Sequence, residues 1–243
     1  MDERAMYEQM VAQLPGNSEK YSLAATAPNP SSPLKGKAII FLGSSVVYGS
    51  DSLGESMADF LGKIDGVNIV KEAVSGTTLV ERSGDGGSSY IARMKTIDKT
   101  LKPDAFICQL STNDATQQMP LGEIARGFDP AEFDTGTITG AIEYIIAYAR
   151  RVFGCPIIFF TGTRYSGIPG ADLYARMVAR LHELSAKWNI GAIDLWNDAS
   201  MLSVTPTDYA LFMSNPIHPT RAGYRDWWGP EFERQLLAWW AQQ

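Results

Sequence analysis

The stretch AIIFLGSSVVYGS, residues 38–50, passes from an apolar run into a glycine and two serines. An apolar run that ends at a glycine is typical of a buried strand followed by a tight turn. Ser44 and Ser45 would then lie at the tip of that strand. A serine is a weak nucleophile on its own, so the rest of the chain has to supply a base and an oxyanion site if either is to react.

The pattern after this stretch alternates between short apolar runs and amphipathic segments. The apolar runs have glycine or proline at their ends and no polar alternation, as expected for strands of a parallel sheet that is covered on both faces. The predicted strands are 37–43, 67–73, 104–111, 156–162 and 189–196. The predicted helices are 55–64, 88–101, 137–153, 171–188 and a last helix that begins near Pro219.

This alternation predicts an α/β fold, a three-layer α/β/α sandwich with a central parallel sheet of about five strands. Residues 37–243 form one domain in this interpretation. Residues 1–36 form an N-terminal arm, a short helix followed by an irregular proline-rich crossing. Ligands of open parallel sheets bind beyond the carboxyl ends of the strands, so function is expected in the loops at that edge.

Composition narrows the functional classes. The chain has 243 residues, a formal net charge of −6 and no cluster of Lys or Arg, so nucleic acid is not an expected partner. The N-terminus does not resemble a signal peptide, and no apolar run is long enough to span a membrane. Cys108 and Cys155 lie in or beside predicted strands and are expected to be buried, reduced thiols of a cytoplasmic protein. Neither a metal site nor a cofactor is expected.

Polar and small residues follow the predicted strands at the carboxyl edge. They form four blocks, GSSV (43–46), SGTT (75–78), STND (111–114) and NPIH (215–218). The chain has two histidines. His182 falls inside a predicted helix and is expected to be an ordinary surface residue, whereas His218 lies in a proline-rich loop before the last helix and is the candidate base.

The four blocks, in this order, resemble those of the SGNH (GDSL-type) esterase and lipase superfamily, which has a flavodoxin-like fold. The resemblance covers residues 37–224. It implies that Ser45 is the nucleophile of an acyl-enzyme mechanism and that His218 is its base. It also implies an oxyanion hole made by the N–H groups of Ser45 and Gly76 and the side-chain amide of Asn113. A glycine allows close approach of backbone to substrate, and an amide donates without losing a proton.

The chain departs from the family pattern at two positions. The aspartate that precedes the family's nucleophile is Ser44, and the aspartate three residues before the base is Asn215. An amide oxygen can still orient a histidine but carries no full charge, as in Cys-His-Asn sites. Asp208 and a backbone carbonyl are candidate substitutes for the missing carboxylate. If Asn215 occupies the orienting position, Asn215→Asp is expected to keep or raise activity.

Other interpretations remain. The departures motivate a catalytically weak or inactive binding protein on the same scaffold. A flavodoxin-type FMN site would leave Asn113 and His218 without a role, and a sugar-nucleotide epimerase would need a lysine where Ser52 stands.

The residues near the motifs are small and polar, which favours short acyl groups over long lipid chains. O-acetyl groups on carbohydrate are one such substrate, so the expected partner is a small-molecule or carbohydrate ester. The loop 113–136 is expected to wall the site. The four C-terminal tryptophans fit a helical core face or a contact in a homo-oligomer.

Overall fold

Five parallel strands form one sheet in the computed structural model, which describes residues 2–242. The strands are β1 (Ala38–Gly43), β2 (Asn68–Ala73), β3 (Ala105–Gln109), β4 (Ile157–Phe160) and β5 (Gly191–Ile193). Their order is β2-β1-β3-β4-β5, so the carboxyl ends of β1, β2 and β3 are neighbours. The predicted parallel five-stranded α/β fold is confirmed.

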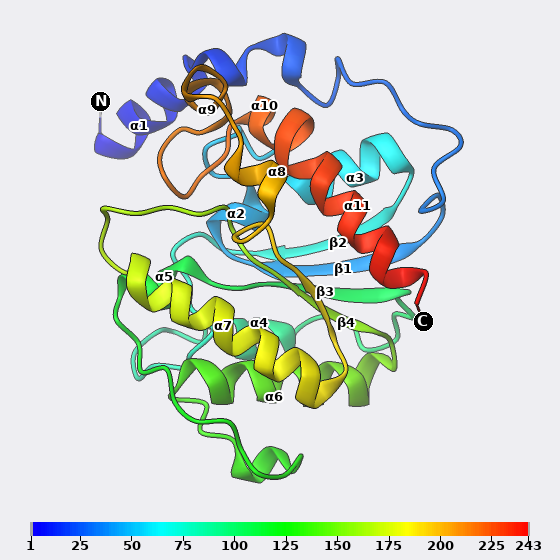
Figure 1. Ribbon diagram of the computed structural model, residues 1–243, viewed down its shortest axis with the longest axis vertical. Coiled ribbons are helices and arrows are strands. Elements are labelled where there is room, and N and C mark those ends of the chain that lie inside the picture. Colours follow the sequence, from blue (N-terminus) through cyan, green and yellow to red (C-terminus); the bar gives the residue numbers. More distant parts are fainter. Residues whose placement is uncertain (1, 243) are drawn as a thin grey trace.

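Alternate side chains of β1 enter two separate hydrophobic cores. Ile40 and Leu42 belong to the core beneath α4 (Tyr90–Met94), α6 (Ile138–Phe153) and α7 (Ala171–Trp188). Ile39 and Phe41 belong to the core beneath α3 (Met57–Asp65) and α11 (Gly229–Trp240). Figure 1 shows these two helical layers on opposite faces of the sheet. A strand with both faces covered needs apolar residues at every position, which is why the opening stretch has no polar alternation.

Helices connect the strands, and most of the long ones match the predicted segments. The helices of the first half are α1 (Glu3–Ala12), α2 (Ser45–Tyr48), α3 (Met57–Asp65), α4 (Tyr90–Met94) and α5 (Thr112–Thr116). Those of the second half are α6 (Ile138–Phe153), α7 (Ala171–Trp188), α8 (Ala199–Leu202), α9 (Pro206–Phe212), α10 (Arg221–Gly223) and α11 (Gly229–Trp240). Short 3-10 turns occur at Pro15–Asn17, Glu19–Tyr21 and Pro130–Glu132, and a π-helical segment, Tyr224–Trp228, joins α10 to α11.

The N-terminal arm packs back over the carboxyl edge of the sheet. Asn17 is buried, and its side-chain amide donates to the carbonyls of Val11 and Asp51 at 2.8 Å each. Gly16 lies so close to Leu211 and Thr220 that an added Cβ would come within 2.0 Å of the Leu211 carbonyl oxygen. The arm is thus fixed against the two loops that follow β1 and α9.

Two sequence-based expectations need correction. The helix predicted over 88–101 ends at Met94, because the Thr96 hydroxyl bonds the Arg93 carbonyl and the Asp98 side chain forms a local turn with Thr100. The loop 113–136 does not wall the site along its whole length. It begins as α5 at the carboxyl edge, but Phe128 packs edge-on against Trp188 at the far end of α7.

Candidate active site

Ser45 begins the single turn α2 directly after β1 and is 7% exposed. The preceding residue, Ser44, is fully buried, and its backbone N–H donates to the Gln109 side-chain oxygen at 3.0 Å. The same oxygen accepts from the Val47 N–H at 3.3 Å, and the Gln109 amide donates to the Ser44 hydroxyl at 3.2 Å. Gln109 therefore holds the loop around Ser44 and Ser45 through neutral hydrogen bonds.

His218 lies in the loop between α9 and α10 and reaches the serine across the sheet edge. Its backbone carbonyl accepts from the Ser214 N–H at 2.9 Å, and an antiparallel bridge joins Met213 to Pro219. These bonds close the loop and direct the imidazole toward α2. The distance from His218 Nε2 to Ser45 Oγ is 2.8 Å, a good hydrogen bond between residues 173 positions apart.

Asn215 orients this imidazole. Its side-chain oxygen lies 3.0 Å from His218 Nδ1 and accepts the backbone N–H groups of Ile217 and His218, also at 3.0 Å each. Three donors converge on one oxygen, so His218 carries its proton on Nδ1 and leaves the Nε2 lone pair for Ser45.

A carboxylate that the sequence analysis missed lies behind Asn215. Asp51 is 2% exposed, and its Oδ2 accepts the Asn215 side-chain N–H at 2.9 Å and the Tyr7 hydroxyl at 2.7 Å. The other candidate, Asp208, lies in the first turn of α9, where its carboxylate accepts from the hydroxyl of the N-cap residue Thr205 at 2.8 Å. In the sequence, the only feature that points to Asp51 is that it is an acidic residue shortly after Ser45 in the same loop.

The expected oxyanion donors lie on the two neighbouring strand ends. Gly76 has a φ of +81°, a left-handed conformation that favours glycine, in the loop after β2. Asn113 is on α5, and its side-chain amide donates to the Thr77 carbonyl at 2.8 Å, next to Gly76. The structure thus brings Gly76 and Asn113 to the strand ends that flank Ser45.

Two buried charged groups hold the loop after β2 in place. The Asp114 carboxylate is fully buried and accepts the N–H groups of Leu79 and Val80 at 2.8 and 3.1 Å. Arg93 donates to the Gly43 carbonyl at 2.8 Å and to the Thr77 hydroxyl at 2.9 Å, which ties the end of β1 to the loop after β2. Burial raises the pKa of Asp114 to about 6, against the opposing effect of these hydrogen bonds.

The environment favours a neutral imidazole. Burial lowers the pKa of His218 below its ordinary value of 6.5, and the negative charge of Asp51 partly opposes that effect. The imidazole is therefore ready to accept a proton at neutral pH.

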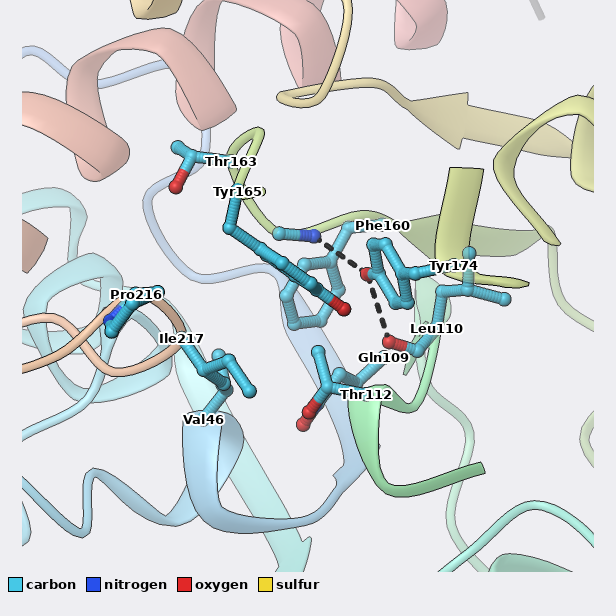
Figure 2. A pocket seen from close by; sticks show the side chains of 11 residues that line it. Val46, Gln109, Leu110, Thr112, Phe160, Thr163, Tyr165, Tyr174, Pro216 and Ile217 are labelled. Atoms are coloured by element: carbon cyan, nitrogen blue, oxygen red, sulfur yellow. Dashed lines mark hydrogen bonds between the residues drawn. The ribbon is translucent and has the colours of Figure 1, made fainter. Parts of the chain in front are cut away.

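A small cavity lies at the carboxyl edge of the sheet, with a volume of about 10 Å³, which is room for one water-sized group. Val46, Thr112 and Ile217, the chain neighbours of Ser45, Asn113 and His218, all line it. Figure 2 shows the Tyr165 ring crossing this space and Tyr174 bonded to Leu110 behind it. Tyr165, which lines the cavity, is 6% exposed.

Two further properties concern residues 2–242. In this range no group of three or more His, Cys, Asp or Glu side chains is arranged to hold a metal ion. The helices within it all fall short of the length and apolar character that a membrane span requires.

Cys108 and Cys155 are buried free thiols. His182 is a half-exposed residue of α7, and its Nε2 lies 2.8 Å from the Asp194 carboxylate.

Residues 41–225 match the GDSL-like Lipase/Acylhydrolase family, and the chain belongs to that family. The match spans all four sequence blocks and the loops that carry Ser45 and His218. A comparison with curated proteins gave no match.

Solved structures share the fold at low sequence identity. A possible lipase from Chitinophaga pinensis has a TM-score of 0.63 and 14% identity, and the alignment covers 84% of this chain and 98% of that one. A member of the lipolytic protein G-D-S-L family from Veillonella parvula has a TM-score of 0.55 and 21% identity, covering 85% and 100%. A carbohydrate esterase family 2 enzyme from Myceliophthora fergusii, which carries a carbohydrate binding domain, has a TM-score of 0.58 and 13% identity, covering 88% and 69%.

Proposed function

We propose that this acylhydrolase is a serine esterase for short acyl esters, with O-acetyl groups on carbohydrate as one substrate class. The observation that carries the proposal is the hydrogen bond of 2.8 Å between Ser45 Oγ and His218 Nε2, with Asn215 on the other ring nitrogen. That arrangement is the nucleophile, base and orienter of a serine hydrolase.

In the proposed reaction, Ser45 Oγ attacks the ester carbonyl carbon while His218 Nε2 takes the serine proton. The tetrahedral intermediate then expels the alcohol, which receives that proton from His218. Water, deprotonated by the same imidazole, hydrolyses the acyl-enzyme and restores Ser45. The backbone N–H groups of Ser45 and Gly76 and the Asn113 amide would stabilise the oxyanion.

The preference for a short acyl group rests on the small cavity. In the proposed binding mode the acyl chain enters between Val46, Thr112 and Ile217, where the cavity of about 10 Å³ has room for about one water-sized group. An acetyl methyl group fits that space, and a butyryl chain would require the wall to move.

We assign the alcohol half to a larger, open groove at the carboxyl ends of β1 and β2. This groove has a volume of about 450 Å³ and is lined in part by Tyr7, Tyr48, Val74 and Ser75. Tyr7 and Tyr48 are 43% and 49% exposed, and exposed aromatic rings suit the faces of sugar rings. A small acyl site next to an open, aromatic-lined groove supports an acetylated carbohydrate as the substrate.

Hydrolysis of p-nitrophenyl acetate, butyrate and octanoate by the wild type and by Ser45→Ala tests the proposal. We expect acetate hydrolysis to be fastest and to fall at least 1,000-fold in Ser45→Ala, by analogy with other serine hydrolases. Equal background rates in both proteins would favour the alternative, a binding protein on this scaffold. A cytoplasmic location is also part of the proposal, and the two free, buried cysteines support it.

A further inference from the structure

We propose that Asp51 supplies the negative charge that this chain lacks at Asn215, and that it acts on His218 through the Asn215 amide. This inference rests on the proposed function. Asp51 is a positioning residue in this interpretation, because it contacts neither the substrate nor the reacting atoms.

The first step of the argument concerns the Asn215 side chain. An amide has one oxygen and one nitrogen, and the orientation decides which of them faces His218. Asp51 Oδ2 can only accept when it is ionised, so it selects the amide nitrogen, at 2.9 Å, and turns the amide oxygen toward His218 Nδ1. Asp51 thereby reinforces the tautomer that leaves Nε2 free for Ser45.

The second step concerns charge. When His218 takes the serine proton, the imidazole becomes a cation in a largely buried position. Asp51 Oδ2 lies 3.9 Å from His218 Nδ1, and its side chain is 1% exposed. A buried opposite charge at that distance stabilises the cation much more than an exposed one would. No proton moves to Asp51; the serine proton passes to Nε2 and then to the leaving alcohol.

The third step is that hydrogen bonds to three further residues fix Asp51 in the fold. The Tyr7 hydroxyl donates to Oδ2 at 2.7 Å and the Ser50 hydroxyl to Oδ1 at 2.9 Å. The Asn17 amide holds the Asp51 backbone carbonyl. A carboxylate with these partners is fixed in one position rather than free to leave the site.

Other titratable groups near the pair are already engaged. The Tyr224 hydroxyl donates to the Val46 carbonyl, and Asp59 is paired with Lys71 at 2.6 Å. The Arg221 guanidinium is paired with Glu55 at 2.7 Å and lies 3.6 Å from Glu19. Asp51 is therefore the titratable group that contacts the Asn215–His218 unit directly, and Tyr7 contacts Asp51 from behind.

The test compares Asp51→Asn with the wild type, with Asp208→Asn as the matched control. Asparagine at position 51 can still accept from Asn215 and Tyr7, so the substitution removes charge while keeping the shape. We expect kcat for p-nitrophenyl acetate to fall on the order of 100-fold with little change in KM. Asp208→Asn should keep wild-type kcat, and circular dichroism should report folded protein for both variants.

A second measurement does not depend on esterase activity. In a His182→Asn background, His218 is the only histidine, and its pKa can be followed by NMR. Asp51→Asn should lower the pKa of His218, because it removes the charge that opposes the effect of burial. If the wild type hydrolyses no ester, the proposed function fails, but this titration still decides whether Asp51 acts on His218.

An exchange of the two side chains completes the test. Asn215→Asp alone would set two carboxylates within about hydrogen-bonding distance, so the earlier expectation of undiminished activity for that variant no longer holds. Asp51→Asn combined with Asn215→Asp moves the carboxylate onto His218 and should recover activity and raise the pKa of His218. Wild-type kcat and an unchanged His218 pKa in Asp51→Asn would overturn the inference, as would an exchange variant no more active than Asp51→Asn.

Discussion

Ser45 and His218 meet because each is fixed by its own backbone before any substrate arrives. Ser45 starts a helical turn directly after a buried strand, and His218 sits in a loop closed by its own carbonyl. Because both side chains are already held in place, little conformational entropy is lost when they form the proposed reactive geometry.

The decrease of kcat/KM at low pH should report the protonation of His218. A protonated Nε2 cannot accept the serine proton, so kcat/KM should fall as pH decreases through the pKa of His218. Because burial lowers that pKa below 6.5, we expect full activity at pH 7 and a half-maximal point below pH 6.5. A profile of initial rates from pH 4.5 to 8 in buffers of constant ionic strength checks this, and a midpoint above 7 would contradict it.

The sequence predicted Ser45, Gly76, Asn113, Asn215 and His218 as site residues, because each stands in a short block of recognisable type. The structure places His218 within hydrogen-bonding distance of both Asn215 and Ser45. Their chemical roles stay predictions until they are tested. Asp51 could not be predicted, because it meets Asn215 across 164 residues and belongs to no block. Only the fold brings these two residues together.

At the scale of secondary-structure elements, α1 is the least expected contributor to the site. It belongs to the arm, yet Tyr7 reaches Asp51 and lines the open groove. The strands, by contrast, were predicted well, since a run such as 38–42 is apolar at every position. The short helices α2, α5, α8 and α9 were missed because one or two turns give too little periodicity to recognise.

Tyr7→Phe tests the contribution of α1. The variant keeps the aromatic ring in the groove but removes the hydroxyl that donates to Asp51. We expect kcat to fall roughly 3- to 10-fold, as for the loss of one hydrogen bond to a partly screened charged group. Tyr48→Phe removes a hydroxyl from the same groove without touching Asp51 and should stay near wild type. Equal losses in the two variants would assign the effect to substrate binding instead.

Across the whole molecule, we expect stability and catalysis to depend on different regions. The segment from Gly122 to Asp134 leaves the catalytic edge and covers α6 and α7. It is held there by Glu143, which is fully buried and accepts from Lys187 at 2.5 Å, Trp188 at 3.0 Å and the Ala125 N–H at 2.9 Å. The length of this loop suggested a functional role. Its composition does not reveal the buried ion pair that holds it against α6 and α7, so its structural role could not be predicted.

Glu143→Gln should therefore destabilise the protein without affecting its chemistry. It leaves Lys187, whose side chain is 16% exposed, without its carboxylate. Loss of one partner of a buried pair costs about 3 kcal/mol, which corresponds to a decrease in Tm of about 6–12 °C for a chain of this size. Differential scanning calorimetry measures the Tm, and kcat at 25 °C should stay within twofold of wild type. A large fall in kcat with an unchanged Tm would refute this separation.

The two ends of the chain differ in how they can be used as points of attachment. Helix α1 begins beside the groove at the carboxyl edge, whereas α11 ends near Lys37 and Gly191, where β1 and β5 start (Figure 1). A purification tag or a resin linkage at the amino end would crowd the route by which a bulky ester enters. Fixing the protein by its carboxyl end would instead turn the open groove outward, toward the proposed ester substrate.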